Sequence, residues 1–183
     1  RLQRGLFEQH LRFGLATLVL VIDRGMVTKA NLEALAAEQG VGWITALKAP
    51  QVKKLVRDGS LQLSLFDQTN LAEIESPDYP GERLVVCRNP LVAAERARKR
   101  EDLLAATEAA LAPIRDRVEA GTLAGAAAIA LAVGQLIGTR KVKKHFELVI
   151  EDNHFDYSRK RTQIEEEAAL DGFYVLRTNL AVD

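Results

Sequence analysis

The fold is decided by the stretch Leu-Val-Leu-Val-Ile-Asp-Arg-Gly-Met at residues 18–26. Five apolar residues lead to Asp23 and Arg24-Gly25 ends the run, so the pattern predicts a strand that is buried on both faces and finishes in a carboxylate. Ligands of open α/β sheets gather beyond the carboxyl ends of the strands, which places Asp23 where chemistry occurs. An aspartate there can also start a turn or cap a helix, and position alone favours that structural role.

The residues around this stretch predict a βαβ unit. Apolar residues at helical spacing predict a helix over residues 1–14, ahead of the strand. Thr28 has the chemistry of an N-cap, and residues 29–39 keep a helical period of about 3.6 residues. Residues 42–47 form the next predicted strand. Because such crossovers have a fixed hand, the two strands should be parallel neighbours in one sheet.

The pattern changes after Pro50. The elements predicted next are a short helix and three alternating strands: residues 51–58, 61–65, 71–75 and 82–87. Antiparallel strands that follow a parallel βαβ unit indicate a separate, inserted subdomain. The predicted fold class is therefore α/β, with residues 1–49 in the core, residues 50–170 as an α+β insertion, and residues 171–183 as the strand that returns to the core.

A long helix dominates the predicted insertion. It begins near residue 91, and its buried stripe should carry residues spaced three and four apart: Leu104, Thr107, Leu111, Ile114 and Val118. Pro113 should either kink this helix or open a second one, so a bent helix or a hairpin is expected. The uncharged run 123–138 is shorter than the roughly 20 residues that a membrane span needs, and we expect a close-packed segment whose glycines let backbones approach. The remaining predicted elements are strands at 146–150 and 154–157, a helix at 162–170 and a strand at 172–177.

Composition narrows the classes of protein. The chain has 183 residues, of which 48% are hydrophobic, so it can bury a real core. Its formal net charge is zero, so any nucleic-acid contact must come from local basic patches. The single cysteine, Cys87, excludes an internal disulfide and favours a reducing, cytoplasmic setting. The chain starts without methionine or an apolar leader, which suggests a piece of a longer protein.

Two basic clusters stand out among the polar residues. They are Arg140, Lys141, Lys143 and Lys144, followed by Arg159, Lys160 and Arg161. We call these residues the basic hairpin. They could neutralise a few DNA phosphates without reading sequence, and an ordinary charged surface is an equally good interpretation. The sequence lacks the motifs of phosphate loops, dinucleotide sites, serine nucleophiles and zinc sites, and histidines 145 and 154 fit a solvated hairpin better than a metal site.

Several motifs, taken in order, resemble one family of enzymes. They are Asp23-Arg24-Gly25-Met26, the stretch 82–100, Lys144-His145-Phe146 and the stretch 171–178. Together they resemble bacterial insertion-sequence transposases that use a DDE triad. The resemblance implies a ribonuclease-H-like core interrupted by an insertion, with Asp23 as the second carboxylate of the triad. In that role Asp23 would ligate Mg²⁺ or Mn²⁺, one of two ions that drive DNA cleavage and strand transfer.

The sequence departs from this pattern at the other two triad members. The first aspartate of the family would precede Arg1, and the glutamate helix would follow the strand that ends near Thr178. Tyr157, Arg161 and Glu165 echo the glutamate signature at the wrong spacing, so no further triad member is assigned. The resemblance thus implies a transposase segment acting on element ends and target DNA in the bacterial cytoplasm, at the nucleoid, with no membrane and no nucleotide cofactor, and it leaves self-association open. The alternative is a non-catalytic DNA-binding or assembly module.

Overall fold

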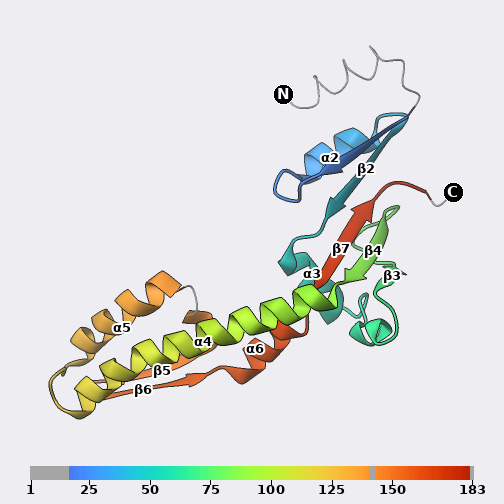
Figure 1. The fold of residues 1–183 in the computed structure, drawn as a ribbon. Helices are drawn as coiled ribbons and strands as arrows, with labels where there is room; N and C mark the ends of the chain where they lie inside the picture. The colour runs from blue at the N-terminus through green and yellow to red at the C-terminus, as the bar shows by residue number, and fades with distance from the viewer. Residues whose placement is uncertain (1–16, 141–142, 182–183) are drawn as a thin grey trace. The chain divides into compact units, whose positions relative to one another are not determined.

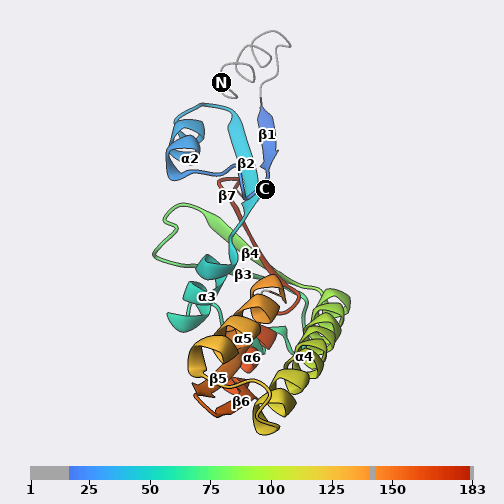
Figure 2. The same ribbon diagram turned by 90° about the vertical axis from the view of Figure 1, so that its left-hand side faces the viewer.

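The computed structural model describes residues 17–140 and 143–181, and it is a mixed α/β structure made of two compact units (Figures 1 and 2). The sheet unit takes the chain up to Asn89 and again from Phe173. The second unit, which we call the helix–hairpin unit, runs from Pro90 to Gly172. The helix predicted over residues 1–14 lies outside the described residues.

The sheet unit is built on a five-stranded mixed sheet in the order β1-β2-β7-β4-β3. Its strands are β1 (Leu18–Ile22), β2 (Val41–Ala46), β3 (Leu71–Ile74), β4 (Arg83–Arg88) and β7 (Phe173–Thr178). Its helices are α2 (Lys29–Ala36), α3 (Ala49–Arg57) and the short 3₁₀ turn η1 (Leu63–Phe66). β7 lies between β2 and β4 and pairs antiparallel with both. This strand therefore connects the parallel β1–β2 pair to the antiparallel β3–β4 pair.

The predicted βαβ unit is confirmed. β1 pairs with β2 in parallel, and Ile22 is the register partner of Thr45. α2 crosses between the two strands, and the Thr28 hydroxyl caps it by accepting the backbone N–H of Asn31 at 3.2 Å. Figure 2 shows this helix beside β2. Leu32 and Leu35 of α2 pack on Trp43, which fixes the helix against the sheet.

The prediction that β1 is buried on both faces is wrong. This strand forms an edge of the described sheet, and its residues alternate between half-buried and exposed. Leu20 and Ile22 pack toward the α2 side, whereas Val19 and Val21 are 49% and 83% exposed. β-branched residues alone therefore did not distinguish a central strand from an edge strand.

The antiparallel strands belong to the same sheet as the βαβ unit. β3 pairs with β4 and β4 pairs with β7, so the break between the units falls at Pro90 where a boundary near residue 50 was expected. The strand predicted over residues 61–65 is wrong. Its backbone bonds are local, from Leu65 N–H to the Gln62 carbonyl and from Asp67 N–H to the Ser64 carbonyl, because the turn buries Leu61 and Phe66.

The helix–hairpin unit consists of helices packed on one β-hairpin. Its elements are α4 (Pro90–Glu119), α5 (Ala126–Arg140), the 3₁₀ turn η2 (Lys143–His145), β5 (Phe146–Glu151), β6 (His154–Arg159) and α6 (Arg161–Ala168). β5 and β6 pair antiparallel, as predicted. All five residues of the predicted stripe on α4 are buried. Leu111, Ile129 and Phe155, from α4, α5 and β6, meet in one core with no exposed surface or almost none.

Two details of this unit differ from expectation. α4 continues through Pro113 as one helix, and the chain turns back only after Glu119, so the hairpin predicted at the proline is absent (Figure 1). The glycines near α5 do not let backbones approach, because a Cβ on Gly134 or Gly138 would meet no atom within 4 Å. Gly121 and Gly125 instead adopt positive φ angles in the turn. None of the helices in the described part of the chain is long and apolar enough to span a membrane.

Candidate active site at the carboxyl ends of the parallel strands

Asp23 lies directly after β1, at the edge where both parallel strands end. The side chain is exposed, and its Oδ1 accepts the backbone N–H of Gly25 at 2.7 Å. The Asp23 carbonyl accepts the N–H of Met26 at 3.0 Å, which closes a tight turn. A Cβ on Gly25 would lie 2.9 Å from Asp23 Oδ1, so glycine gives the carboxylate room. The predicted turn role is therefore present, and the carboxylate remains accessible from solvent.

Thr45 fixes the last residue before Asp23. Its side chain is only 3% exposed, and its hydroxyl donates to the Ile22 carbonyl at 2.8 Å. The bond adds a side-chain link to the β1–β2 ladder at the point where the strand gives way to the turn. Thr45 thereby holds the backbone that carries Asp23.

A groove of about 970 Å³ lies at the same end of β2. We call it the strand-end groove. It is lined by residues that follow β1, residues of α2, the end of β2, the start of α3 and the loop before β4. Its basic and aromatic lining consists of Arg24, Lys29, Trp43, Lys48, Lys54, Tyr79 and Arg177. Arg24 is the residue next to Asp23, so the groove begins beside the candidate carboxylate.

One arginine closes part of this groove. The Arg177 guanidinium makes a two-point ion pair with Glu82, and both side chains are mostly buried. Its Cζ lies 5.3 Å from the Trp43 ring centroid and 4.8 Å from that of Tyr79, so the cation stacks between two aromatic rings. Burial raises the pKa of Tyr79. This arginine is committed to holding the loop before β4.

Two of the other cations in the strand-end groove form ion pairs with described residues, and two do not. Lys54 pairs with Asp78, which raises the pKa of Lys54. Lys29 approaches Glu33 at 3.7 Å on the exposed surface of α2. Arg24 and Lys48 are exposed, and within the described residues neither has a carboxylate partner.

The metal expected from the sequence would find one carboxylate at this place. Asp23 Oδ1 is held by Gly25 and the side chain is open, which suits a single oxygen ligand. Within residues 17–140 and 143–181, no group of three or more His, Cys, Asp or Glu side chains is arranged to hold a metal ion.

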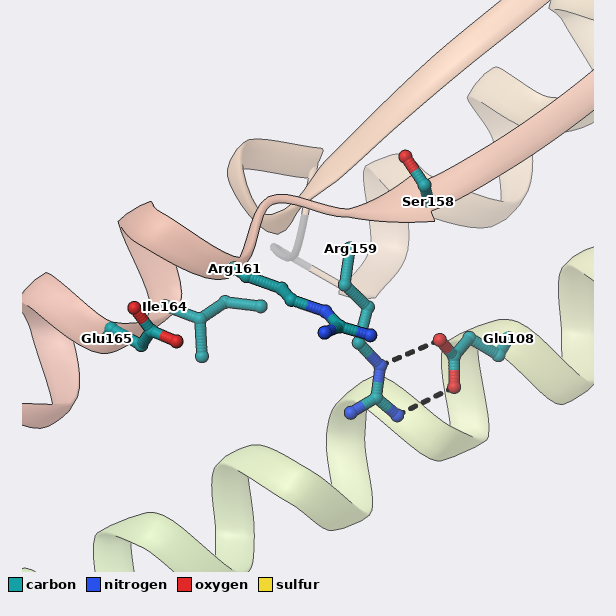
Figure 3. A pocket seen from close by; sticks show the side chains of 6 residues that line it. All are labelled: Glu108, Ser158, Arg159, Arg161, Ile164 and Glu165. Carbon is teal, nitrogen blue, oxygen red and sulfur yellow. Dashed lines mark hydrogen bonds and ion pairs between the residues drawn. The ribbon is translucent and has the colours of Figure 1, made fainter.

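The basic hairpin has a different electrostatic state. Arg159 donates from Nε and Nη2 to the Glu108 carboxylate, both at 2.7 Å, and from Nη1 to Glu101 at 2.8 Å. These bonds raise the pKa of Arg159 and lower that of Glu108. A cavity of about 530 Å³ adjoins the pair, and Figure 3 shows Arg161 extending toward Arg159 from the start of α6.

Other members of the basic hairpin are distributed unevenly. Lys144 donates to Glu167 Oε1 at 2.6 Å, and His145 Nε2 lies 2.9 Å from Glu167 Oε2. Burial raises the pKa of Glu167, but these two partners outweigh it and leave the pKa low. Lys160 and Arg161 are exposed, with no ion pair to another described residue. Lys141 lies outside the described residues, and the side chains of Arg140 and Lys143 are not described.

Sequence reasoning missed the strand-end groove. Lys48 and Arg177 lie far apart in the chain, and only the return of β7 beside β2 brings the second one to the groove. A usable signal was the position of Lys48 just past the predicted strand 42–47, at the same edge as Asp23.

The comparisons with known proteins assign no family. No protein-family model, no curated protein and no solved structure matches this chain significantly.

Proposed function

We propose that this chain is a segment of a DDE transposase, with a ribonuclease-H-like core and the helix–hairpin unit as its insertion. The observation that carries the proposal is the place of Asp23, an open carboxylate at the shared end of two parallel strands, beside a groove lined by cations. The choice of this family rests on the order of the sequence motifs that resemble it. The proposed reaction is metal-dependent cleavage of DNA at element ends and joining of those ends to target DNA.

Asp23 would hold one Mg²⁺ or Mn²⁺ ion, and the complete enzyme would use two. A bound ion neutralises charge on the phosphodiester and favours attack by water or a 3′-hydroxyl. The residues in this chain do the positioning. Thr45 holds the backbone before Asp23, Gly25 fixes the carboxylate rotamer by its N–H, and Arg177 holds the loop that borders the groove.

A second candidate is a DNA-binding module without catalysis. The observation that favours it is the exposure of Lys160 and Arg161 without ion-pair partners among the described residues. Such cations can contact phosphates in a salt-dependent manner. Under this alternative, binding would persist and Asp23 would be only a turn residue.

The test is Mg²⁺-dependent strand joining by the whole protein that contains this chain. Asp23→Asn should lower the rate by at least about 100-fold, because the loss of a metal ligand removes a large share of transition-state stabilisation. Asp58→Asn is the matched control, since the Asp58 Oδ1 also accepts a backbone N–H two residues on, from Ser60 at 3.1 Å, yet lies after α3. Full activity of Asp23→Asn would contradict the proposal.

A metal swap separates ligation from turn geometry. In Asp23→Cys the thiolate prefers softer ions, so Mn²⁺ should restore more activity than Mg²⁺ does. Equal loss with both ions, combined with normal salt-dependent DNA binding, would support the non-catalytic module instead.

A further inference from the structure

We propose that the strand-end groove is a phosphodiester-binding site in which Lys48 and Arg24 contact the backbone of a nucleic acid. This inference rests on the proposed function, because it places a phosphate next to the carboxylate assigned to metal binding. It adds Lys48, which lies in neither the family motifs nor the basic hairpin, and it gives Arg24 of the first motif a role in binding.

The first support is position along the two parallel strands. Ile22 and Thr45 are register partners, and adjacent strands lie about 4.8 Å apart. Arg24 follows β1 by two residues and Lys48 follows β2 by two, so both cations leave the sheet at the same edge. Both line the strand-end groove. A phosphate bound there would lie at the edge that carries Asp23.

The second support is the state of the groove's charges. Arg177 and Lys54 are held by Glu82 and Asp78, and those contacts explain their presence without a ligand. Arg24 and Lys48 have no such partner in the described part of the chain, and both side chains are exposed. A groove whose remaining charges are positive is suited to an anion.

The wall of the strand-end groove also contains the indole of Trp43. This residue lines the groove, is 1% exposed, and its Nε1–H has no hydrogen-bond partner among the described residues. A buried donor without an acceptor is unfavourable for the folded state. The wall of the groove therefore contains one polar group that no described residue satisfies, whereas the phosphate contacts proposed here are those of Lys48 and Arg24.

The start of α3 adds a weaker electrostatic term. Lys48 is the N-cap of this helix, and its own backbone N–H is used by Gln51 Oε1 at 2.9 Å. The helix dipole nevertheless places partial positive charge at the groove wall. A polymer backbone fits better than a nucleotide cofactor, because the groove is open and the sequence has no glycine-rich phosphate loop.

The test measures binding of a 20-base-pair duplex of random sequence by fluorescence anisotropy at several salt concentrations. It uses the whole protein that contains this chain, without divalent metal, so that no cleavage occurs. Lys48→Ala should weaken binding about 3- to 10-fold and reduce the magnitude of the salt slope by about 0.9, the value for one phosphate contact. Arg24→Ala should act in the same way.

The matched control is Lys53→Ala, an exposed lysine on α3 that does not line the groove. It should leave the salt slope unchanged, and Lys48→Arg should restore it. A salt slope for Lys48→Ala equal to that of Lys53→Ala, with the thermal midpoint unchanged, would overturn the inference. If Lys48→Ala is less stable, Lys48→Gln carries the same criterion. Because Asp23→Asn tests joining separately, an unchanged slope with lost joining rejects this groove alone and leaves the proposed function in place.

Discussion

The strand-end groove and the basic hairpin both carry clustered cations, but the protein uses those cations differently. In the hairpin, Arg159 is satisfied by two glutamates and Lys144 by a third. In the groove, Arg24 and Lys48 are exposed and form no ion pair with a carboxylate in the described part of the chain. The basic hairpin, which is the more conspicuous cluster in the sequence, therefore uses part of its charge in ion pairs within the fold. The less conspicuous cations of the strand-end groove are available to a ligand.

This difference indicates that the ability of a basic surface to attract an anion depends more on whether its cations are paired with carboxylates than on how many cations it has. A bidentate arginine–carboxylate contact stabilises the packing of two elements and leaves little positive potential outside. An exposed lysine at a strand end contributes little to stability, and its positive electrostatic potential remains available to attract an anion from solvent. The predictions below test this division between packing and binding residues, beginning with the strongest.

The core under the basic hairpin should dominate the stability of its unit. Leu111→Ala removes a fully buried side chain from the cluster of α4, α5 and β6 and should lower the free energy of unfolding by about 2–5 kcal/mol. Leu131→Ala, at a residue that is 64% exposed on α5, is the control and should change it by less than about 0.5 kcal/mol. Chemical denaturation measures both, and equal effects would contradict the packing described here.

Arg159 and Arg161 should behave oppositely although they are two residues apart. Arg159→Ala leaves Glu108 and Glu101 without their shared partner and should cost roughly 2–3 kcal/mol of stability. Arg161→Ala should cost less than about 0.5 kcal/mol and should instead weaken the salt-dependent binding of DNA. Reversed effects would mean that Arg159 is the binding residue and that its ion pairs contribute little.

Local patterns in the sequence predicted most of the secondary structure. The cap at Thr28 and the helical period after it correctly predicted α2, and the stripe from Leu104 to Val118 correctly predicted the buried face of α4. These signals are local because capping and helical periodicity depend on residues within a few turns. The alternation at 61–65 failed because Leu61 and Phe66 are both buried, the second of them by the 3₁₀ turn η1 that replaces the predicted strand.

The candidate site could be predicted only in part. The chain order placed Asp23 at a strand end, and the structure has it at the shared edge of β1 and β2. The pairing of Arg159 with Glu108 could not be read, because the partners are 51 residues apart and meet only when β6 packs on α4. Exposure of Val21 depends on which strand lies beside β1, which is also a non-local property.

Acid should weaken the helix–hairpin unit through Glu167. Its pKa is lower in the folded protein than in the unfolded chain, so its contribution is present above the unfolded value of about 4.3 and is lost as the pH falls through the folded pKa. Glu167→Gln should therefore cost roughly 1–2 kcal/mol at pH 7 and nothing at a pH below the folded pKa. Exposed Glu166, the neighbouring residue on α6, is the control. Urea unfolding at a series of pH values measures the effect, and parallel curves for Glu167→Gln and the original protein would contradict it.

A modest loss of stability is expected when one hydrogen bond of the sheet unit is removed. Thr45→Val keeps the shape of the side chain but removes the hydroxyl that donates to the Ile22 carbonyl, which should cost about 1 kcal/mol. Because this bond holds the backbone before Asp23, the same variant should also raise the Mg²⁺ concentration needed for half-maximal strand joining, and Thr45→Ser should restore it. A loss of stability without a change in metal dependence would show that Thr45 only packs the sheet. A change in metal dependence would show that the buried Thr45 hydroxyl helps to position the exposed carboxylate of Asp23 at the edge of the sheet.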